Sequence, residues 1–126
     1  MKTILIVEDN EKNMKLVRDI LRHQGHETVE AAAGEEGVRL AVERRPDLVL
    51  MDIQLPDIDG IEALRRIRGE PALDSVPVIA VSASVMPDDQ QKIVNSGFDA
   101  FITKPINLKQ FLATVQRLLA EGRASP

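Results

Sequence analysis

The sequence predicts an α/β domain in which a doubly wound, five-stranded parallel sheet is flanked by five helices. Short apolar runs rich in Ile and Val alternate strictly with segments of helical periodicity, and this alternation favours a parallel sheet with right-handed crossovers. The apolar runs are continuous, which is typical of strands that are buried on both faces. The chain has 126 residues, enough for one domain with a hydrophobic core.

Four strongly apolar runs and one weaker run are the predicted strands. The strong runs are 3–8 (TILIVE), 48–52 (LVLMD), 76–82 (VPVIAVS) and 100–104 (AFITK). The weaker run, 26–31 (HETVEA), contains charged residues among its apolar ones. We therefore expect this run nearer an edge of the sheet, where burial on both faces is not required.

Five further segments carry the apolar spacing of amphipathic helices. They are 11–24, 35–45, 60–68, 87–96 and 107–121. The apolar stripes expected to face the core are Met14, Leu16, Val17, Ile20 and Leu21; Val38, Ala41 and Val42; Ile61, Leu64 and Ile67; and Leu108, Phe111, Leu112, Val115, Leu118 and Leu119. The segment 87–96 is the weakest helix, because only Ile93 and Val94 in it are strongly apolar.

Several residues mark the expected ends of helices and of the domain. Asn107 is predicted to be the N-cap of the last helix, and Gly25 and Gly97 lie where helices are expected to stop. The domain is expected to span 1–121, and the remaining residues, 122–126, are expected to form a frayed tail.

Composition excludes several functional classes. The absence of cysteine excludes disulfides and thiolate metal sites, and it fits the cytoplasmic location that we expect. No apolar run approaches the ~20 residues of a membrane span, and the stretch MKTILIVEDN ends in acids, unlike a signal peptide. A net charge of −4 and only three aromatic residues argue against binding to nucleic acid. Protein partners and small anions remain.

Five polar residues follow or end the predicted strands. Glu8 and Asp9 come directly after the first strand, Asp52 ends the third, Ser82 ends the fourth, and Lys104 ends the fifth. Because the carboxyl ends of parallel strands lie at one edge of a sheet, we expect these side chains to converge there, where ligands of open α/β sheets bind.

The residue types at this edge predict phosphoryl chemistry. Three neighbouring carboxylates require a cation, and oxygen ligands without His or Cys favour Mg²⁺. A phosphate oxygen commonly completes the coordination shell of this ion. Lys104 can pair with a carboxylate or a phosphoryl oxygen, and Ser82 can donate a hydrogen bond to another. Because an aspartate can act as a covalent nucleophile toward phosphorus, we predict that Asp52 accepts a phosphoryl group.

The sequence resembles the receiver domain of bacterial two-component response regulators. The matching stretches are ILIVEDN (4–10), PDLVLMDIQLPDIDG (46–60), PVIAVSA (77–83) and FITKPI (101–106). The resemblance covers essentially the whole chain, and it is closest to DivK-like single-domain regulators and to receivers of hybrid kinases. It implies the flavodoxin-like receiver fold, with strand order 2-1-3-4-5.

The resemblance also implies a role for each residue of the metal and phosphoryl site. Glu8 and Asp9 match the acidic pair that holds Mg²⁺, partly through water. Asp52 matches the phosphoacceptor and a metal ligand. Gln54 matches the position whose backbone carbonyl binds the metal, and Lys104 matches the lysine that contacts phosphate.

Further matches concern the response to phosphorylation. Ser82 matches the switch hydroxyl, and Phe101 matches the aromatic side chain that swings inward when this hydroxyl moves. Pro105 matches a proline that often follows a cis peptide bond. Ala83 matches a position kept small beside the phosphoryl group, and Ser84 is expected, with Gln54, to tune hydrolysis. The weakly anchored helix 87–96 is the element expected to shift, and partners are expected to bind near it.

The function expected from this resemblance is a phosphorylation-controlled switch, not an enzyme beyond self-phosphorylation and slow autodephosphorylation. A histidine kinase or a histidine phosphotransfer protein would supply the phosphoryl group, and the phosphorylated chain, a monomer or weak dimer, would bind protein partners. Met1 directly before the first strand favours a complete short protein.

Three alternatives stay open. The chain could be the relay receiver of a hybrid kinase, and the residues do not separate this from a stand-alone regulator. A Mg²⁺-dependent phosphohydrolase would need an acid–base carboxylate two residues after Asp52, where Gln54 stands. A phosphate-insensitive scaffold is disfavoured by the complete set of acids, Ser82 and Lys104.

Overall fold

The computed structural model describes residues 2–83 and 86–123, so Ser84 and the last residues of the tail lie outside the described residues. The strands are β1 (Thr3–Val7), β2 (Glu27–Ala31), β3 (Leu48–Asp52), β4 (Val78–Ser82) and β5 (Ala100–Thr103). The helices are α1 (Glu11–His23), α2 (Gly34–Arg44), α3 (Gly60–Arg68), α4 (Pro87–Asn95) and α5 (Leu108–Glu121), with a short 3-10 helix, η1, at Pro71–Leu73. All ten predicted elements are confirmed, and η1 is the element that the sequence did not predict.

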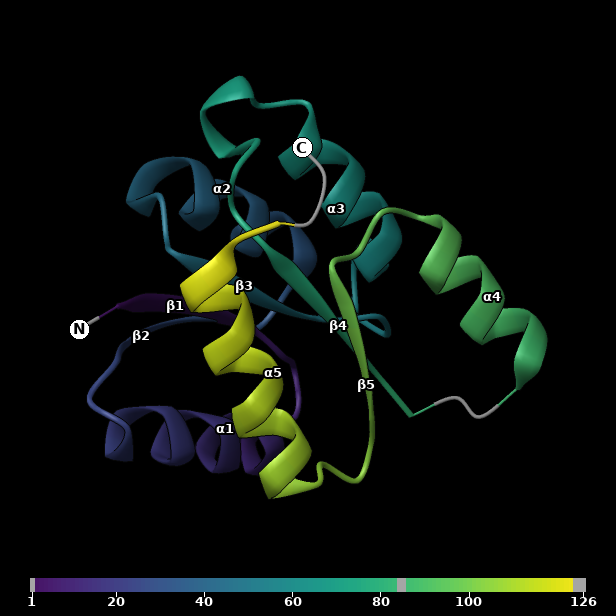
Figure 1. The fold of residues 1–126 in the computed structure, drawn as a ribbon. Coiled ribbons are helices and arrows are strands. Elements are labelled where there is room, and N and C mark those ends of the chain that lie inside the picture. The colour runs from purple at the N-terminus through teal and green to yellow at the C-terminus, as the bar shows by residue number, and fades with distance from the viewer. Residues whose placement is uncertain (1, 84–85, 124–126) are drawn as a thin grey trace.

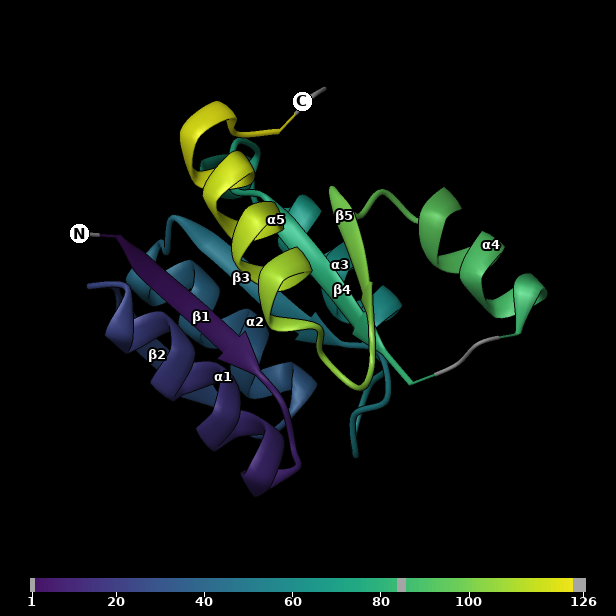
Figure 2. The same ribbon diagram turned by 60° about the horizontal axis from the view of Figure 1, so that its bottom comes forward.

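The strands form one parallel sheet in the order β2-β1-β3-β4-β5, which confirms the predicted topology. The weak strand β2 is at an edge, as expected from its charged residues. All five strands pair in parallel, and Figure 2 shows the arrows of β1 and β4 pointing the same way, so the loops that follow the strands gather at one edge of the sheet.

Helices cover both faces of the sheet (Figure 1). In β1, Ile4 and Ile6 pack into the cluster that also contains residues of α1 and α5, whereas Leu5 and Val7 pack into the cluster shared with α2 and α3. Successive side chains of a strand point to opposite faces, so a strand between two helical layers must be apolar at every position. This burial explains the continuous apolar runs of the sequence.

The predicted helix stripes are partly wrong, because the helices bury narrower faces than predicted. Three residues expected in the core are exposed: Leu16 (47%), Val42 (40%) and Leu108 (54%). In α2 the buried residues are Gly34, Gly37 and Ala41. A Cβ on Gly37 would lie 2.7 Å from Cγ2 of Val7, so the backbone of this helix approaches β1 closely, while Val38 and Leu40 are only partly buried against the core.

The predicted helix ends are confirmed. Gly25 and Gly97 have φ angles of 89° and 100°, a region that glycine adopts without strain. The side chain of Asn107 caps α5 by accepting a hydrogen bond from the N–H of Gln110. In α4, Ile93 is the buried residue, which confirms the weak anchoring expected of this helix. Among residues 2–83 and 86–123, no helix is long and apolar enough to cross a bilayer.

Candidate functional site

The structure brings the polar residues of the strand ends together at the carboxyl edge of the sheet. Glu8, Asp52 and Ser82 are all buried there, with exposed fractions of 6%, 4% and 1%. Asp9 is exposed beside them, and Lys104 directly follows β5. The edge therefore combines two buried carboxylates with an exposed one.

Lys104 bridges the two buried acids. Its Nζ lies 3.0 Å from Oε1 of Glu8 and 2.9 Å from Oδ2 of Asp52. Carboxylate oxygens of Glu8, Asp9 and Asp52 all lie within 4.8 Å of one another. One ammonium group thus faces a cluster of three carboxylates.

Backbone pairing beyond the strands holds these side chains in place. The N–H of Glu8 donates to the carbonyl of Ala31 at 3.0 Å, and the N–H of Lys104 donates to the carbonyl of Ser82 at 2.9 Å. The hydrogen-bonding ladder therefore continues past the ends of β1 and β5. The N–H of Gln54 donates to Oδ1 of Asp52 at 3.0 Å, which orients this carboxylate from its own loop.

Gly60 allows α3 to begin directly against Asp52. A Cβ at this position would lie 2.5 Å from the carbonyl oxygen of Asp52 and 2.9 Å from Cα of Ile53. The N–H of Gly60 donates to the carbonyl of Ile53 at 2.9 Å, so this contact closes the base of the loop between β3 and α3. A side chain at Gly60 would push the loop away from the acidic cluster.

Burial makes the acidic cluster a poor place for negative charge. The pKa of Glu8 is raised to about 7, first by burial and then by its hydrogen bond and charge repulsion with Asp52, against the lowering effect of Lys104 and the N–H of Asn10. Burial works to lower the pKa of Lys104, but its ion pairs with Asp52 and Glu8 outweigh burial and raise it. Lys104 therefore stays charged, and Glu8 titrates near neutral pH.

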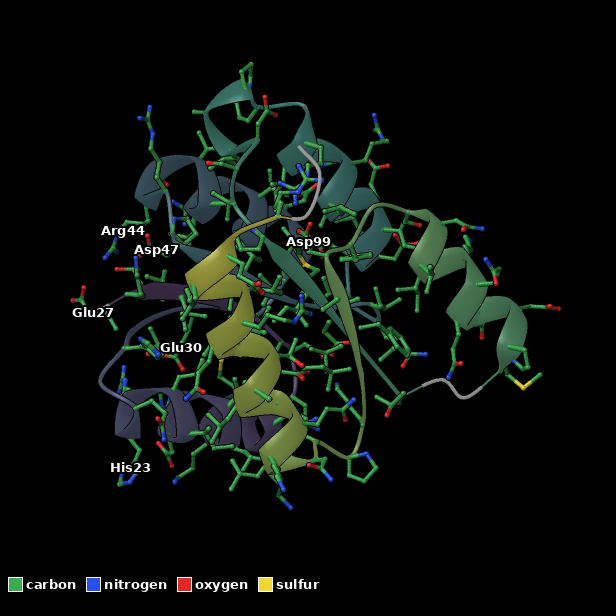
Figure 3. All side chains as sticks on the ribbon, viewed as in Figure 1. His23, Glu27, Glu30, Arg44, Asp47 and Asp99 are labelled. Carbon is green, nitrogen blue, oxygen red and sulfur yellow. The ribbon has the colours of Figure 1, made fainter. Side chains whose placement is uncertain are left out.

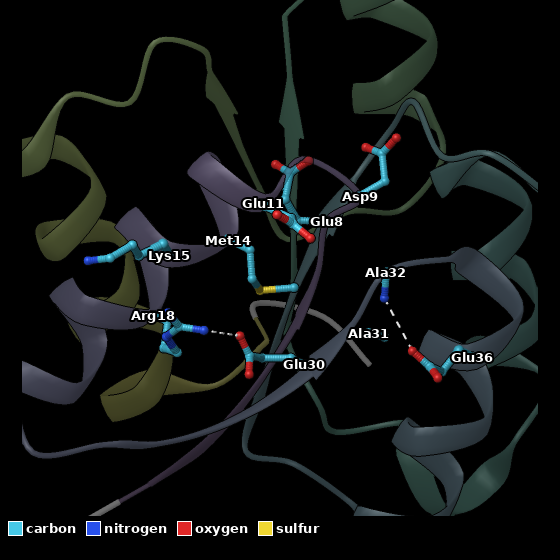
Figure 4. A pocket seen from close by; sticks show the side chains of 10 residues that line it. All are labelled: Glu8, Asp9, Glu11, Met14, Lys15, Arg18, Glu30, Ala31, Ala32 and Glu36. Atoms are coloured by element: carbon cyan, nitrogen blue, oxygen red, sulfur yellow. Dashed lines mark hydrogen bonds and ion pairs between the residues drawn. The ribbon is translucent and has the colours of Figure 1, made fainter.

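The donor set fits a hard divalent cation. Three carboxylates without His or Cys are the oxygen ligands that Mg²⁺ prefers. Glu8 and Asp9 also line an open pocket of about 560 Å³ between α1, β2 and α2 (Figure 4). In this pocket Nη1 of Arg18 forms an ion pair with Oε1 of Glu30 at 2.7 Å. The residues that line the pocket include more acids than bases, so the approach to the cluster is acidic.

Comparison with known proteins identifies the family. The family model of the response regulator receiver domain matches residues 4–116. The chain belongs to the response regulator receiver family. It is 44% identical over 121 residues to the polar-differentiation response regulator DivK of Brucella anthropi, a match that covers 96% of this chain and 98% of that one.

Solved receivers share the fold of this receiver. The receiver domain of a sensor histidine kinase from Pseudomonas aeruginosa, described with magnesium coordinated in its active-site cleft, superposes with a TM-score of 0.89 at 32% identity, covering 95% of this chain and 98% of that one. A CheY-like receiver from Methanospirillum hungatei gives 0.86 at 31% identity, with 96% and 95% covered. The chain is thus a receiver of two-component signalling, similar to DivK.

The remaining residues singled out in the sequence lie on β5 and on the loops that follow β3, β4 and β5. Phe101 is half-buried on β5, and Gln54 and Ala83 are exposed on loops next to the site. The peptide bond between Lys104 and Pro105 is cis, which confirms that prediction. The roles assigned to these residues in switching stay predictions.

Sequence reasoning missed a contact made by Asp57, which lies in the loop between Asp52 and α3. The carboxylate of Asp57 accepts hydrogen bonds from the N–H groups of Gly34 and Glu35, at 2.8 and 2.9 Å. These groups are the N-terminus of α2 and lie far from Asp57 in the sequence. The one local signal was Ala33, whose side chain cannot cap the helix that follows it.

Proposed function

We propose that this receiver is a phosphorylation-controlled switch that accepts a phosphoryl group on Asp52 from a histidine kinase or a histidine phosphotransfer protein. Mg²⁺ would be held by the carboxylates of Glu8, Asp9 and Asp52 and by the backbone carbonyl of Gln54. The observation that carries the proposal is the bridge from Lys104 Nζ to Asp52 at 2.9 Å and Glu8 at 3.0 Å, beside carboxylates within 4.8 Å of one another.

In the proposed transfer, a carboxylate oxygen of Asp52 attacks phosphorus. A new O–P bond forms, the P–N bond of the donor phosphohistidine breaks, and its electron pair stays on the imidazole nitrogen, which takes up a proton. Mg²⁺ supplies positive charge for the phosphoryl oxygens in such a site. Lys104 is held charged beside Asp52, so it can pair with one phosphoryl oxygen, and Ser82 can donate a hydrogen bond to another.

The phosphoryl group would then act as a switch. It adds roughly two negative charges, which attract Lys104 and the hydroxyl of Ser82. Movement of Ser82 displaces the loop after β4, and Phe101 fills the space that this loop leaves. Helix α4 shifts in response because it is weakly anchored, with Ile93 as its buried residue. The face formed by α4, β5 and α5 then becomes the surface that partners bind.

Acetyl phosphate provides the direct test of the phosphoacceptor. The intact mass should increase by one phosphoryl group when the chain is incubated with acetyl phosphate and Mg²⁺, and without Mg²⁺ or in Asp52→Asn it should not. Asp47→Asn is the matched control, because Asp47 is an exposed acid that precedes β3, at the opposite edge of the sheet (Figure 3). Uptake by Asp52→Asn at the rate of the unmodified chain would show that the acceptor is a different residue.

A relay function is the second candidate, because two similar solved structures are receivers of histidine kinases, from Pseudomonas aeruginosa and Syntrophus aciditrophicus. A relay receiver passes its phosphoryl group on to a phosphotransfer histidine. Incubating the phosphorylated chain with a histidine phosphotransfer protein distinguishes the two functions. Rapid transfer supports a relay, and retention of the group on Asp52 supports an output switch.

Two other classes make different predictions in the same experiment. A phosphohydrolase would release phosphate from a generic phosphoester with multiple turnovers, but Gln54 occupies the position where its acid–base carboxylate would be needed. A scaffold receiver would bind partners without taking up a phosphoryl group.

A further inference from the structure

We propose that Asp57 is a positioning residue of the Mg²⁺ site, which holds the loop that carries Gln54 against the N-terminus of α2. The inference rests on the proposed function, because it concerns the affinity of that site for Mg²⁺. Asp57 itself would not touch the metal, and it would act through the backbone of residues 53–59.

The loop between β3 and α3 is fixed at its base. The N–H of Ile53 donates to the carbonyl of Val81 at 3.0 Å, and the carbonyl of Ile53 accepts from the N–H of Gly60 at 2.9 Å. Gln54 comes directly after this anchored residue and is exposed. The carbonyl assigned to the metal therefore lies at the first position where the loop leaves the sheet.

The tip of the loop is attached to a different helix. Oδ1 of Asp57 accepts from the N–H of Gly34 at 2.8 Å, and Oδ2 accepts from the N–H of Glu35 at 2.9 Å. The first N–H groups of a helix have no partner within the helix and carry its positive dipole end, so a carboxylate binds them well. Backbone N–H groups lower the pKa of Asp57 to about 2. That of Glu35 contributes most, and those of Ile58, Gly34 and Asp57 itself add to the effect.

Packing reinforces this attachment. A Cβ on Gly34 would lie 2.5 Å from Cγ1 of Ile58 and 3.3 Å from Oδ1 of Asp57, so the loop fits directly against the helix backbone. Ile58 also packs against the core cluster beneath α2 and α3. With its base and tip both held, the loop has few conformations, and a pre-ordered ligand binds a metal more tightly than a mobile one.

The test compares Mg²⁺ affinity with global stability. Asp57→Ala should weaken Mg²⁺ binding, measured by titration calorimetry, by about tenfold, the lower end of the range for residues that support metal ligands. Asp57→Asn should weaken it less, because the amide oxygen can still accept one of the two hydrogen bonds.

Asp47→Ala is the matched control. Oδ2 of Asp47 accepts from the N–H of Thr3 at 2.8 Å, so this variant also removes an exposed acid that bonds distant backbone, but at the opposite edge of the sheet. It should leave Mg²⁺ affinity unchanged. An equal loss of affinity in Asp47→Ala overturns the inference, since the effect would then be one of general stability.

A second control separates the loop attachment from simple capping of α2. Ala33 has the extended backbone of an N-cap, so Ala33→Asp in the Asp57→Ala background should restore the cap and the stability while leaving the loop unattached. Mg²⁺ affinity should then stay weak, and its recovery would overturn the inference. The loss of affinity should also persist in about 1 M KCl, where charges farther apart than about 3 Å are screened.

The outcomes for the inference and for the proposed function differ. Failure of the unmodified chain to bind Mg²⁺ overturns the proposed function, and the inference with it. Tight binding by the unmodified chain and equal binding by Asp57→Ala overturn the inference alone. If Asp57→Ala does not fold, Asp57→Asn decides, and an affinity equal to that of the unmodified chain rejects the role.

Discussion

Acidification should weaken Mg²⁺ binding because Glu8 must lose a proton before it can bind a metal. Its pKa of about 7 lies well above the usual value for glutamate, because Glu8 is buried and hydrogen-bonded to Asp52. Metal ligands bind as anions, so Mg²⁺ and a proton compete for this carboxylate. Binding should therefore weaken as the pH is lowered from about 8 to about 6.

The expected magnitude follows from the pKa of Glu8. With a pKa of about 7, roughly nine tenths of Glu8 is ionised at pH 8 and roughly one tenth at pH 6. The apparent affinity for Mg²⁺ should therefore fall by about tenfold between these pH values, which corresponds to about 1.4 kcal/mol. Near pH 7, binding should release about half a proton per Mg²⁺.

Titration calorimetry in two buffers of different ionisation enthalpy measures both the affinity and the protons released. Glu8→Gln is the control, since its weaker binding should no longer depend on pH in this range. An affinity that is constant from pH 6 to pH 8 in the unmodified chain would refute the assignment of a proton to Glu8 at neutral pH.

Three further predictions concern stability and response, and urea unfolding tests the first and the last. Without metal, the free energy of unfolding should fall by at most about 3 kcal/mol as pH rises from 4.5 to 7. In this range Glu8 keeps its proton in the folded state but loses it in the unfolded state, so rising pH favours unfolding. Glu8→Gln should remove this fall. Lys104→Ala should still accept a phosphoryl group on Asp52, but the amide NMR signals of α4 should no longer shift on phosphorylation; an unchanged shift would exclude the coupling role. Gly60→Ala should destabilise the fold by about 1–3 kcal/mol, since its Cβ would meet the carbonyl oxygen of Asp52 at 2.5 Å, and a neutral effect would mean that the loop can move aside.

The sheet could be predicted because its burial leaves a clear trace in the sequence. Strands β1 and β3 lie between two helical layers, so their fully buried positions, from Ile4 and from Leu48 onward, are apolar up to the first acid. The helix faces were harder to predict. Apolar residues at helical spacing do not reveal how close a helix approaches the sheet, so the exposure of Leu16 and Val42 could not be foreseen.

The acidic cluster could be predicted for a topological reason. Parallel strands bring their carboxyl ends together, so residues at those ends meet whatever the details of packing. Asp57 escaped prediction because its partners, Gly34 and Glu35, belong to another helix. Asp99 is a similar case: its carboxylate bonds Arg68 at 3.1 Å and Arg123 at 3.0 Å, and no regular spacing in the sequence links the three.

The same charges that would bind the metal oppose folding in its absence. Two buried acids share the single ammonium group of Lys104, and Asp9 adds a third negative charge nearby. Bound Mg²⁺ would relieve this repulsion, and a ligand at about ten times its Kd stabilises a folded protein by about 1.4 kcal/mol. Neutral substitutions in the cluster, such as Glu8→Gln, should therefore make the metal-free fold more stable while removing a metal ligand. The negative charges that bind the metal are the same charges that destabilise the fold without it.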